Sequence, residues 1–140
     1  SGGLPLGGIL MSQKAADAIA PGMHGTTFGG GPLACRVALE FFEILDELLP
    51  QIRTVGEYFR AELRQLQRQH SFIQEVRGAG LMIGVELAIP GKDMVMEGIR
   101  QGLLFNCTHD TVLRFLPAYT LKEKHVDKAI KMLRKIFAKY

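Results

Sequence analysis

The chain has 140 residues, enough for one domain with a hydrophobic core. Its hydrophobic fraction of 47% and charged fraction of 22% exclude global disorder. The net charge is only +3, and bases alternate with acids along the expected helices, which argues against a nucleic-acid-binding surface. No apolar run reaches membrane-spanning length, and two cysteines, Cys35 and Cys107, give no disulfide framework. We therefore expect a cytoplasmic protein without nucleic-acid or membrane partners.

The N-terminal segment resembles the interior of a fold. Pro5 to Ser12 is mostly apolar and predicts a buried strand. Ser12 is a suitable cap for a short helix from Gln13 to Ile19, which Pro21-Gly22 would end. Because the chain starts at Ser1 without methionine and enters this apolar segment at once, we expect it to be a fragment of a longer polypeptide.

A glycine-rich loop, His24-Gly25-Thr26-Thr27-Phe28-Gly29-Gly30-Gly31, follows and leads into Pro32, a residue suited to the first helical position. The unpaired N–H groups of a helix start, beside two threonine hydroxyls, can bind an oxyanion such as a phosphate. The alternative is a plain tight turn with a threonine cap. The spacing matches neither the dinucleotide fingerprint nor a P-loop.

Two long helices are expected next. Apolar residues at helical spacing from Leu33 to Leu48 predict a well-buried helix that stops before Pro50. A second helix, about 51 to 69, has an apolar stripe of Ile52, Val55, Phe59, Leu63 and Leu66. Its basic residues Arg60, Arg64 and Arg68 recur every four positions, and we interpret them as a solvated face, the alternative being a functional basic stripe.

The rest of the chain is rich in strands. Four strands are expected, at 73–76, 81–87, 103–107 and 112–116. A short helix over 93–101 should end at Gly102, and the last two strands should meet at a Thr108-His109-Asp110 turn. A capping box formed by Thr120 and Glu123 predicts the start of a final helix. Its buried stripe would comprise Val126, Ile130, Leu133 and Phe137.

Arg114 is a candidate binding residue because it lies in the middle of an apolar strand. Arginine is costly there unless its guanidinium meets an anion, and the planar group suits two-point contact with a carboxylate. The alternative is an internal ion pair with an acid of this chain. His70, His109 and His125 show no metal-ligand spacing with cysteine or carboxylate, so we assign no metal site.

Several of these segments together resemble the C-terminal part of the class III aminotransferases, a pyridoxal-phosphate-dependent family of fold type I. The resemblance spans nearly the whole chain in the family's order, which makes it specific to the family, and within the family it is closest to the acetylornithine members. The matching segments are Leu4-Pro5-Leu6-Gly7-Gly8, His24-Gly25-Thr26-Thr27-Phe28-Gly29-Gly30, Pro32-Leu33-Ala34-Cys35, Arg77-Gly78-Ala79-Gly80-Leu81-Met82-Ile83-Gly84 and Leu113-Arg114-Phe115-Leu116-Pro117.

The resemblance implies an α/β fold with an α+β small domain. Residues 1–40 would be the end of the large cofactor-binding domain and the start of a connecting helix. Residues 41–140 would be the rest of that helix and a small domain, a sheet with helices packed on it. The enzyme would be a homodimer with active sites at the subunit interface, acting on amino acids and 2-oxo acids.

The resemblance also implies residue roles. Thr27 would bind the phosphate of pyridoxal 5'-phosphate in the neighbouring subunit, Thr26 would line the substrate site, and Arg114 would bind the substrate carboxylate. Two departures from the family pattern are Gly31, where asparagine is usual, and Ala118-Tyr119 after Pro117.

The catalytic lysine is expected before the Gly-Gly-Leu-Pro stretch, upstream of Ser1. The family's lysine holds the cofactor as a Schiff base. We therefore assign no catalytic residue within the 140 residues and expect them to be inactive alone. The intact enzyme would transfer an amino group from N-acetylornithine to 2-oxoglutarate, in arginine biosynthesis. The alternatives are another ω-aminotransferase, of the ornithine or 4-aminobutyrate type, and a non-catalytic dimerisation module.

Overall fold

The computed structural model describes residues 3–140, so Ser1 and Gly2, where the fragment is expected to begin, lie outside the described residues. The chain divides into two compact units, 1–47 and 48–140. No helix of the described part is long and apolar enough to cross a membrane.

The first unit contains helix α1 (Gln13–Asp17) and the beginning of helix α2 (Pro32–Gln69). Ser12 caps α1 as expected, because its hydroxyl accepts a hydrogen bond of 3.3 Å from the N–H of Ala15. The strand expected at Pro5 to Ser12 is wrong: this segment is irregular. A strand needs a partner for its backbone groups, and this unit offers no other strand among its described residues.

Helix α2 is one element where the sequence predicted two. Pro50 lies inside it and removes one backbone donor, yet the helix continues to Gln69. The apolar stripe expected after Pro50 is confirmed, since Ile52, Val55, Phe59, Leu63 and Leu66 are all buried. The earlier part is not buried as expected: Leu33 is 71% exposed and Val37 only half-buried. The reason is that no described residue of the first unit is fully buried, so this stripe has no core to join.

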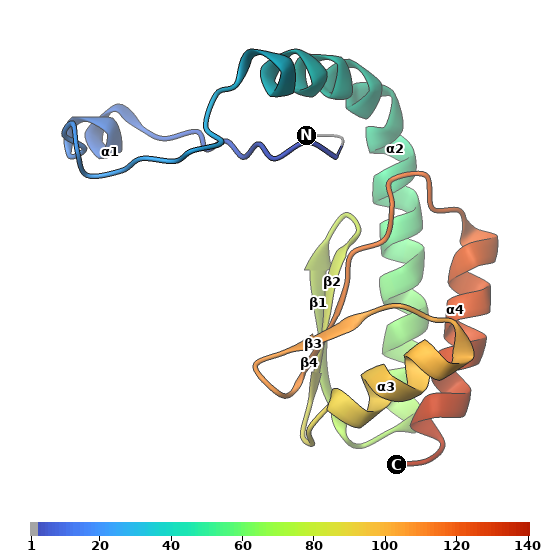
Figure 1. Ribbon diagram of the computed structural model, residues 1–140. Coiled ribbons are helices and arrows are strands. Elements are labelled where there is room, and N and C mark those ends of the chain that lie inside the picture. The colour runs from blue at the N-terminus through green and yellow to red at the C-terminus, as the bar shows by residue number, and fades with distance from the viewer. Residues whose placement is uncertain (1–2) are drawn as a thin grey trace. The chain divides into compact units, whose positions relative to one another are not determined.

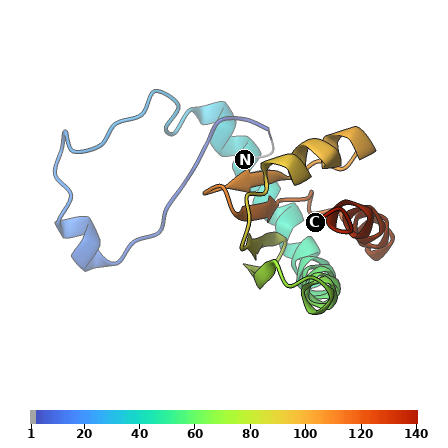
Figure 2. The ribbon, with the colours of Figure 1, turned by 90° about the horizontal axis from the view of Figure 1, so that it is seen from below.

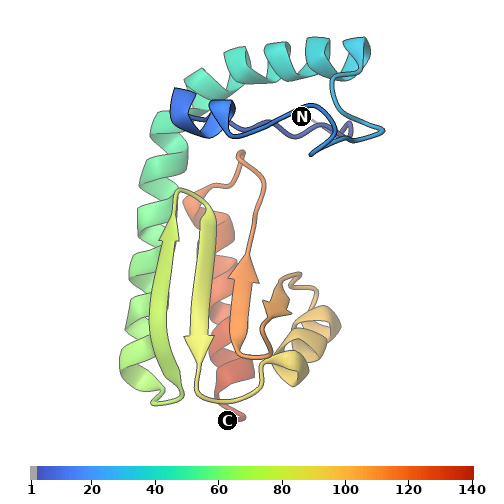
Figure 3. The ribbon, with the colours of Figure 1, turned by 90° about the vertical axis from the view of Figure 1, so that its left-hand side faces the viewer.

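The second unit contains a four-stranded antiparallel sheet in the order β1-β2-β4-β3 (Figures 1 and 3). The strands are β1 (Ile73–Ala79), β2 (Met82–Leu87), β3 (Asn106–Thr108) and β4 (Val112–Phe115). All four expected strands therefore exist, although β3 is shorter than predicted and β1 continues through Arg77-Gly78-Ala79 into a tight hairpin.

Helices cover only one face of this sheet. The part of α2 in this unit lies on the same side as helix α4 (Glu123–Phe137), as Figures 1 and 2 show. Alternate strand residues such as Val85 and Leu113 are buried beneath these helices. The four stripe residues of α4 are buried as predicted. Figure 3 looks onto the opposite face, which carries the residues between them, such as Gly84 and Arg114.

The sequence predicted one helix end correctly and one helix start incorrectly. Helix α3 (Lys92–Gln101) ends at Gly102, whose φ of 79° gives the left-handed cap that the sequence predicted. The capping box expected at Thr120 is wrong, because α4 begins three residues later. There the ring Nδ1 of His125 accepts a 3.1 Å hydrogen bond from the N–H of Lys122. A turn from Ala118 to Leu121 precedes it and takes the place of a helical first turn.

Candidate functional site

The predicted site residues lie in both units. Thr26 and Thr27 belong to the glycine-rich loop of the first unit, and Arg114 belongs to β4 in the second.

The loop of the first unit is shaped by its glycines. Both threonines are exposed, and a turn over 27–30 follows them. A Cβ atom at Gly29 would overlap the methyl group of Thr26, and Gly30 has a φ of 78°, which favours glycine. The glycines thus let the chain fold back beside the threonine side chains before α2 begins.

This loop and the start of α2 enclose a shallow depression of about 400 Å³. The first hydrogen bond of α2 runs from the N–H of Cys35 to the carbonyl of Gly31, at 3.0 Å. The N–H groups of Leu33 and Ala34 therefore have no acceptor within the helix. Free N–H groups, a helix start and the Thr27 hydroxyl are a donor set of the kind that binds a phosphate group.

On the open face of the second unit's sheet, four residues form one row across all four strands. Arg77 of β1 pairs with Gly84 of β2, Gly84 pairs with Arg114 of β4, and Arg114 pairs with Asn106 of β3. Because directly paired residues point to the same face, the two arginines flank the side-chain-free position of Gly84.

The two arginines of this row have different partners. Arg77 donates from Nη1 to Glu75 at 2.8 Å and from Nη2 to Glu86 at 2.9 Å. Arg114 donates from Nε to the side-chain oxygen of Asn106 at 3.1 Å. Among residues 3–140, no carboxylate lies within ion-pair distance of Arg114. The described residues therefore do not support the alternative interpretation of Arg114, in which it forms an internal ion pair with an acid of this chain.

Glu86, one of the two acids that pair with Arg77, is stabilised in its ionised form. Hydrogen bonds from the Thr111 hydroxyl, at 2.8 Å, and from Arg77 lower the pKa of Glu86 below its ordinary value. Hydrogen bonds to Glu86 and Glu75 raise the pKa of Arg77 above its ordinary value. The positive charge of Arg77 is thus compensated locally, which leaves Arg114 as the arginine of the row able to meet an external anion.

A shallow groove of about 530 Å³ runs over three members of this row, Arg77, Gly84 and Arg114. The β3–β4 turn forms part of its wall, with His109 and Asp110 at φ values of 49° and 59°. The expected turn at 108–110 is therefore confirmed, and its left-handed backbone brings His109 to the groove. The groove is lined by Arg77, Gly84, Thr108, His109, Val112 and Arg114, among others.

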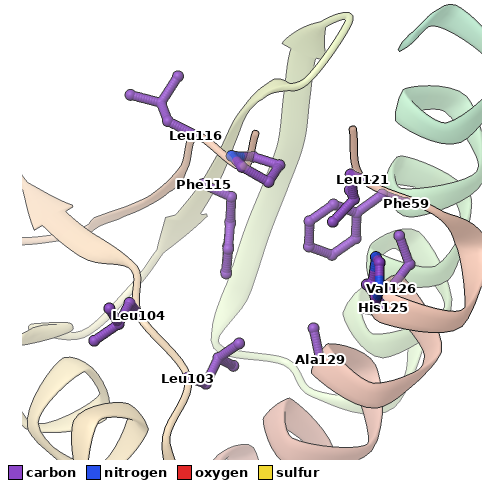
Figure 4. A pocket seen from close by; sticks show the side chains of 10 residues that line it. Phe59, Leu103, Leu104, Phe115, Leu116, Leu121, His125, Val126 and Ala129 are labelled. Atoms are coloured by element: carbon purple, nitrogen blue, oxygen red, sulfur yellow. The ribbon is translucent and has the colours of Figure 1, made fainter. Parts of the chain in front are cut away.

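A second hollow in this unit has different chemistry. It measures about 230 Å³ and lies between α2, the end of β4 and α4, with Phe59, Phe115 and Val126 around it (Figure 4). Its polar group is His125, whose Nδ1 already accepts from Lys122. With apolar walls and an occupied ring nitrogen, this hollow lacks the convergent polar groups typical of a substrate site.

The remaining candidates play no part in these regions. Residues 3–140 contain no group of three His, Cys, Asp or Glu side chains able to hold a metal ion. Both cysteines are free thiols. Burial raises the pKa of the Cys107 thiol, which donates to the carbonyl of Asp110 at 3.2 Å.

Neither Gly84 nor Asn106 was predicted from the sequence as a site residue. Gly84 was part of a recognised motif, and a glycine inside a strand is itself a signal of close approach or open space. Asn106 gave no such signal, because its contact with Arg114 depends on the register of β3 and β4.

Comparison with known proteins assigns this chain to a family. The model of the family described as "Aminotransferase class-III" matches residues 1–137. The chain is 45% identical over 138 residues to the acetylornithine aminotransferase of Methanocaldococcus jannaschii. The aligned region covers 97% of this chain and 35% of that protein.

Solved structures of aminotransferases are also similar to this chain. The acetylornithine aminotransferase of Elizabethkingia anophelis superposes with a TM-score of 0.73 at 29% identity, over 89% of this chain and 33% of that one. An ornithine aminotransferase from Toxoplasma gondii, described with partial occupancy of PLP at its active site, gives 0.73 at 36% identity, over 89% and 31%.

The chain belongs to the class-III aminotransferase family. It spans 35% of the length of the curated relative from Methanocaldococcus jannaschii.

Proposed function

We propose that this chain is part of an aminotransferase that moves an amino group from N-acetylornithine to 2-oxoglutarate, in arginine biosynthesis. The observation that carries the proposal is Arg114, an arginine on an open sheet face with an amide partner and no acid beside it among the described residues. Such a group binds a substrate carboxylate in two-point contact. The identity to an acetylornithine aminotransferase supports this choice of substrate.

The cofactor would be pyridoxal 5'-phosphate, with Thr27 and the start of α2 as ligands of its phosphate. When bound, this cofactor supplies the electron sink for amino-group transfer. Thr26 would line the substrate site. In this proposal residues 1–40 are the end of the large domain with the start of the connecting helix, and residues 41–140 the rest of that helix with the small domain.

The first unit supports a role within a larger assembly. None of its described residues is fully buried, and large apolar side chains are exposed, including Ile9 at 80% and Leu10 at 104%. Apolar surface of this extent requires a covering partner. A large domain and a second subunit of a homodimer would provide it.

A second candidate is ornithine aminotransferase. The ornithine enzyme of Staphylococcus carnosus is 37% identical over 139 residues, which makes its substrate the main competitor. The two candidates share the carboxylate role of Arg114 and differ in the amino donor.

The test uses the native polypeptide, isolated and sequenced through the residues preceding Ser1. A longer chain with a lysine just before the Gly-Gly-Leu-Pro stretch, and transamination of 2-oxoglutarate with N-acetylornithine preferred over ornithine and 4-aminobutyrate, is the expected result. Preference for ornithine would establish the second candidate. A native polypeptide without that lysine and without activity would identify a non-catalytic dimerisation module.

A further inference from the structure

The two arginines of the sheet row are fixed by groups of different charge. Arg77 meets the carboxylates of Glu75 and Glu86, whereas Arg114 meets the uncharged side-chain amide of Asn106. An amide oxygen accepts a hydrogen bond without neutralising the guanidinium. Arg114 is therefore oriented while its full positive charge remains available.

The atom that donates also matters. A guanidinium can grip a carboxylate through the edge formed by Nε and one Nη, or through the edge formed by both Nη atoms. In Arg114 the Nε–H is already used by Asn106, at 3.1 Å. The edge with both Nη atoms is the one left for two-point contact.

We propose that Asn106 is a positioning residue that presents the Nη edge of Arg114 to the substrate carboxylate. This inference rests on the proposed function, in which Arg114 binds that carboxylate. Asn106 is itself placed by backbone pairing, because it lies directly opposite Arg114 in the β3–β4 ladder.

The other neighbour of Arg114 in the row has no side chain of its own. Gly84 lies directly opposite Arg114 on β2, and the atom nearest to a Cβ at Gly84 would be Cγ1 of Val112, at 3.5 Å. The β2 side of the arginine therefore carries no side chain at Gly84 itself, although the side chains of Val112 and Arg77 lie within van der Waals distance of that position, and the amide of Asn106 lies on the β3 side.

The experiment measures steady-state kinetics of the native polypeptide with 2-oxoglutarate. Asn106→Ala should raise the KM for 2-oxoglutarate about tenfold, the worth of a hydrogen bond to a charged group, and change kcat less than twofold. In an Arg114→Ala background the same substitution should change KM less than twofold, because it acts only through the arginine. An equal effect with and without Arg114, or no effect on KM when Arg114 is present, overturns the proposal.

Asn106→Asp is the second variant, and it separates positioning from mere support of the strand. The aspartate oxygen can accept the same Nε–H bond, but its charge would compensate Arg114 as the glutamates compensate Arg77. We expect the Nε–H proton of Arg114, followed by ¹⁵N NMR in the 140-residue chain, to stay protected from exchange in this variant and to lose protection in Asn106→Ala. The KM of Asn106→Asp should nevertheless be at least as high as that of Asn106→Ala; restoration of the unmodified KM overturns the proposal.

The failures can be told apart. If Arg114→Ala leaves the KM for 2-oxoglutarate unchanged, the carboxylate role of Arg114 is wrong and the inference falls with it. If Arg114→Ala raises KM but Asn106→Ala does not, only the role of Asn106 is wrong.

Discussion

Gly56 of α2 lies directly against Gly80 of the β1–β2 turn, so closely that a methyl group at position 56 would overlap the carbonyl oxygen of Gly80. Gly80 itself has a φ of 52°, in the left-handed region. The pair fixes the hairpin tip on the helix, and this hairpin carries Arg77 and Gly84 of the sheet row.

We predict that Gly56→Ala destabilises the chain by about 2 kcal/mol, because backbone must shift to admit the methyl group. Urea unfolding followed by circular dichroism measures this. The matched control is Gly84→Ala, where the added Cβ meets only ordinary van der Waals contacts and the expected change is below about 0.5 kcal/mol. Equal stability losses in the two variants would contradict the prediction.

Arg60 holds the same turn from the helix side. Its Nη1 donates to the carbonyl of Gly80 at 2.7 Å, and its Nη2 pairs with Glu57. Arg60→Ala should cost about 2 kcal/mol, since the hydrogen bond from a charged donor and the packing of a buried side chain are lost. Arg64→Ala is the control, because Arg64 pairs with the same Glu57 but is 46% exposed; its expected cost is below about 0.5 kcal/mol. Equal losses of unfolding free energy in the Arg60→Ala and Arg64→Ala variants would contradict the prediction.

Glu97 makes the stability of the chain sensitive to acid. Hydrogen bonds from Lys139 and Gln101, with a smaller contribution from Arg100, lower its pKa to about 2. A carboxyl with a depressed pKa stabilises the fold above its ordinary pKa, and this stabilisation is lost as the pH falls from about 4.5 toward 2. Glu97→Gln should therefore flatten the pH dependence of unfolding in that window.

Two partner variants check this prediction. Lys139→Met should flatten the same part of the curve, and Arg100→Met should do so less, because Arg100 contributes the smaller share. Unfolding free energies measured from pH 5 to pH 2 decide the matter; an unchanged slope in Glu97→Gln would show that this carboxyl does not contribute.

Arg114→Ala in the native polypeptide should raise the KM for 2-oxoglutarate about a hundredfold, because two hydrogen bonds from a charged donor are lost. Cofactor absorbance should persist. Arg100→Ala, which removes a guanidinium that is 71% exposed on α3, serves as the control for loss of one positive charge. A similar rise in KM in both variants would point to net charge rather than to a specific contact.

Thr27→Val should weaken the affinity for pyridoxal phosphate about tenfold, through loss of one hydroxyl donor to the phosphate. Thr26→Val should retain that affinity and change the KM for the amino donor. Cofactor titration by absorbance gives the first quantity and steady-state kinetics the second. Exchanged outcomes would reverse the roles of the two threonines.

The sequence predicted the second unit well because its signals are local. The left-handed cap at Gly102 and the buried stripe of α4 follow from residue type and spacing alone. Pro50 misled the prediction, because α2 continues through it despite the lost backbone donor. The expected strand at Pro5 to Ser12 failed for another reason, since its apolar residues give no information about a partner strand.

Long-range contacts set the limit for the site as well. Arg60 was interpreted as part of a solvated stripe, yet it is buried because the hairpin turn, some twenty positions further along, supplies a carbonyl for it. Arg114 could be selected from its apolar surroundings, but its amide partner depends on strand register. The roles of Thr26, Thr27 and Arg114 remain predictions until the variants above are measured.

The strand order β1-β2-β4-β3 also has a consequence for how the second unit folds. β1 and β2 form one hairpin and β3 and β4 another, so two of the three strand pairings join neighbours in the chain. Only the β2–β4 pairing must close a longer loop, the one that contains α3. Since the entropy of loop closure is concentrated in that single step, docking of the two preformed hairpins would set the folding rate.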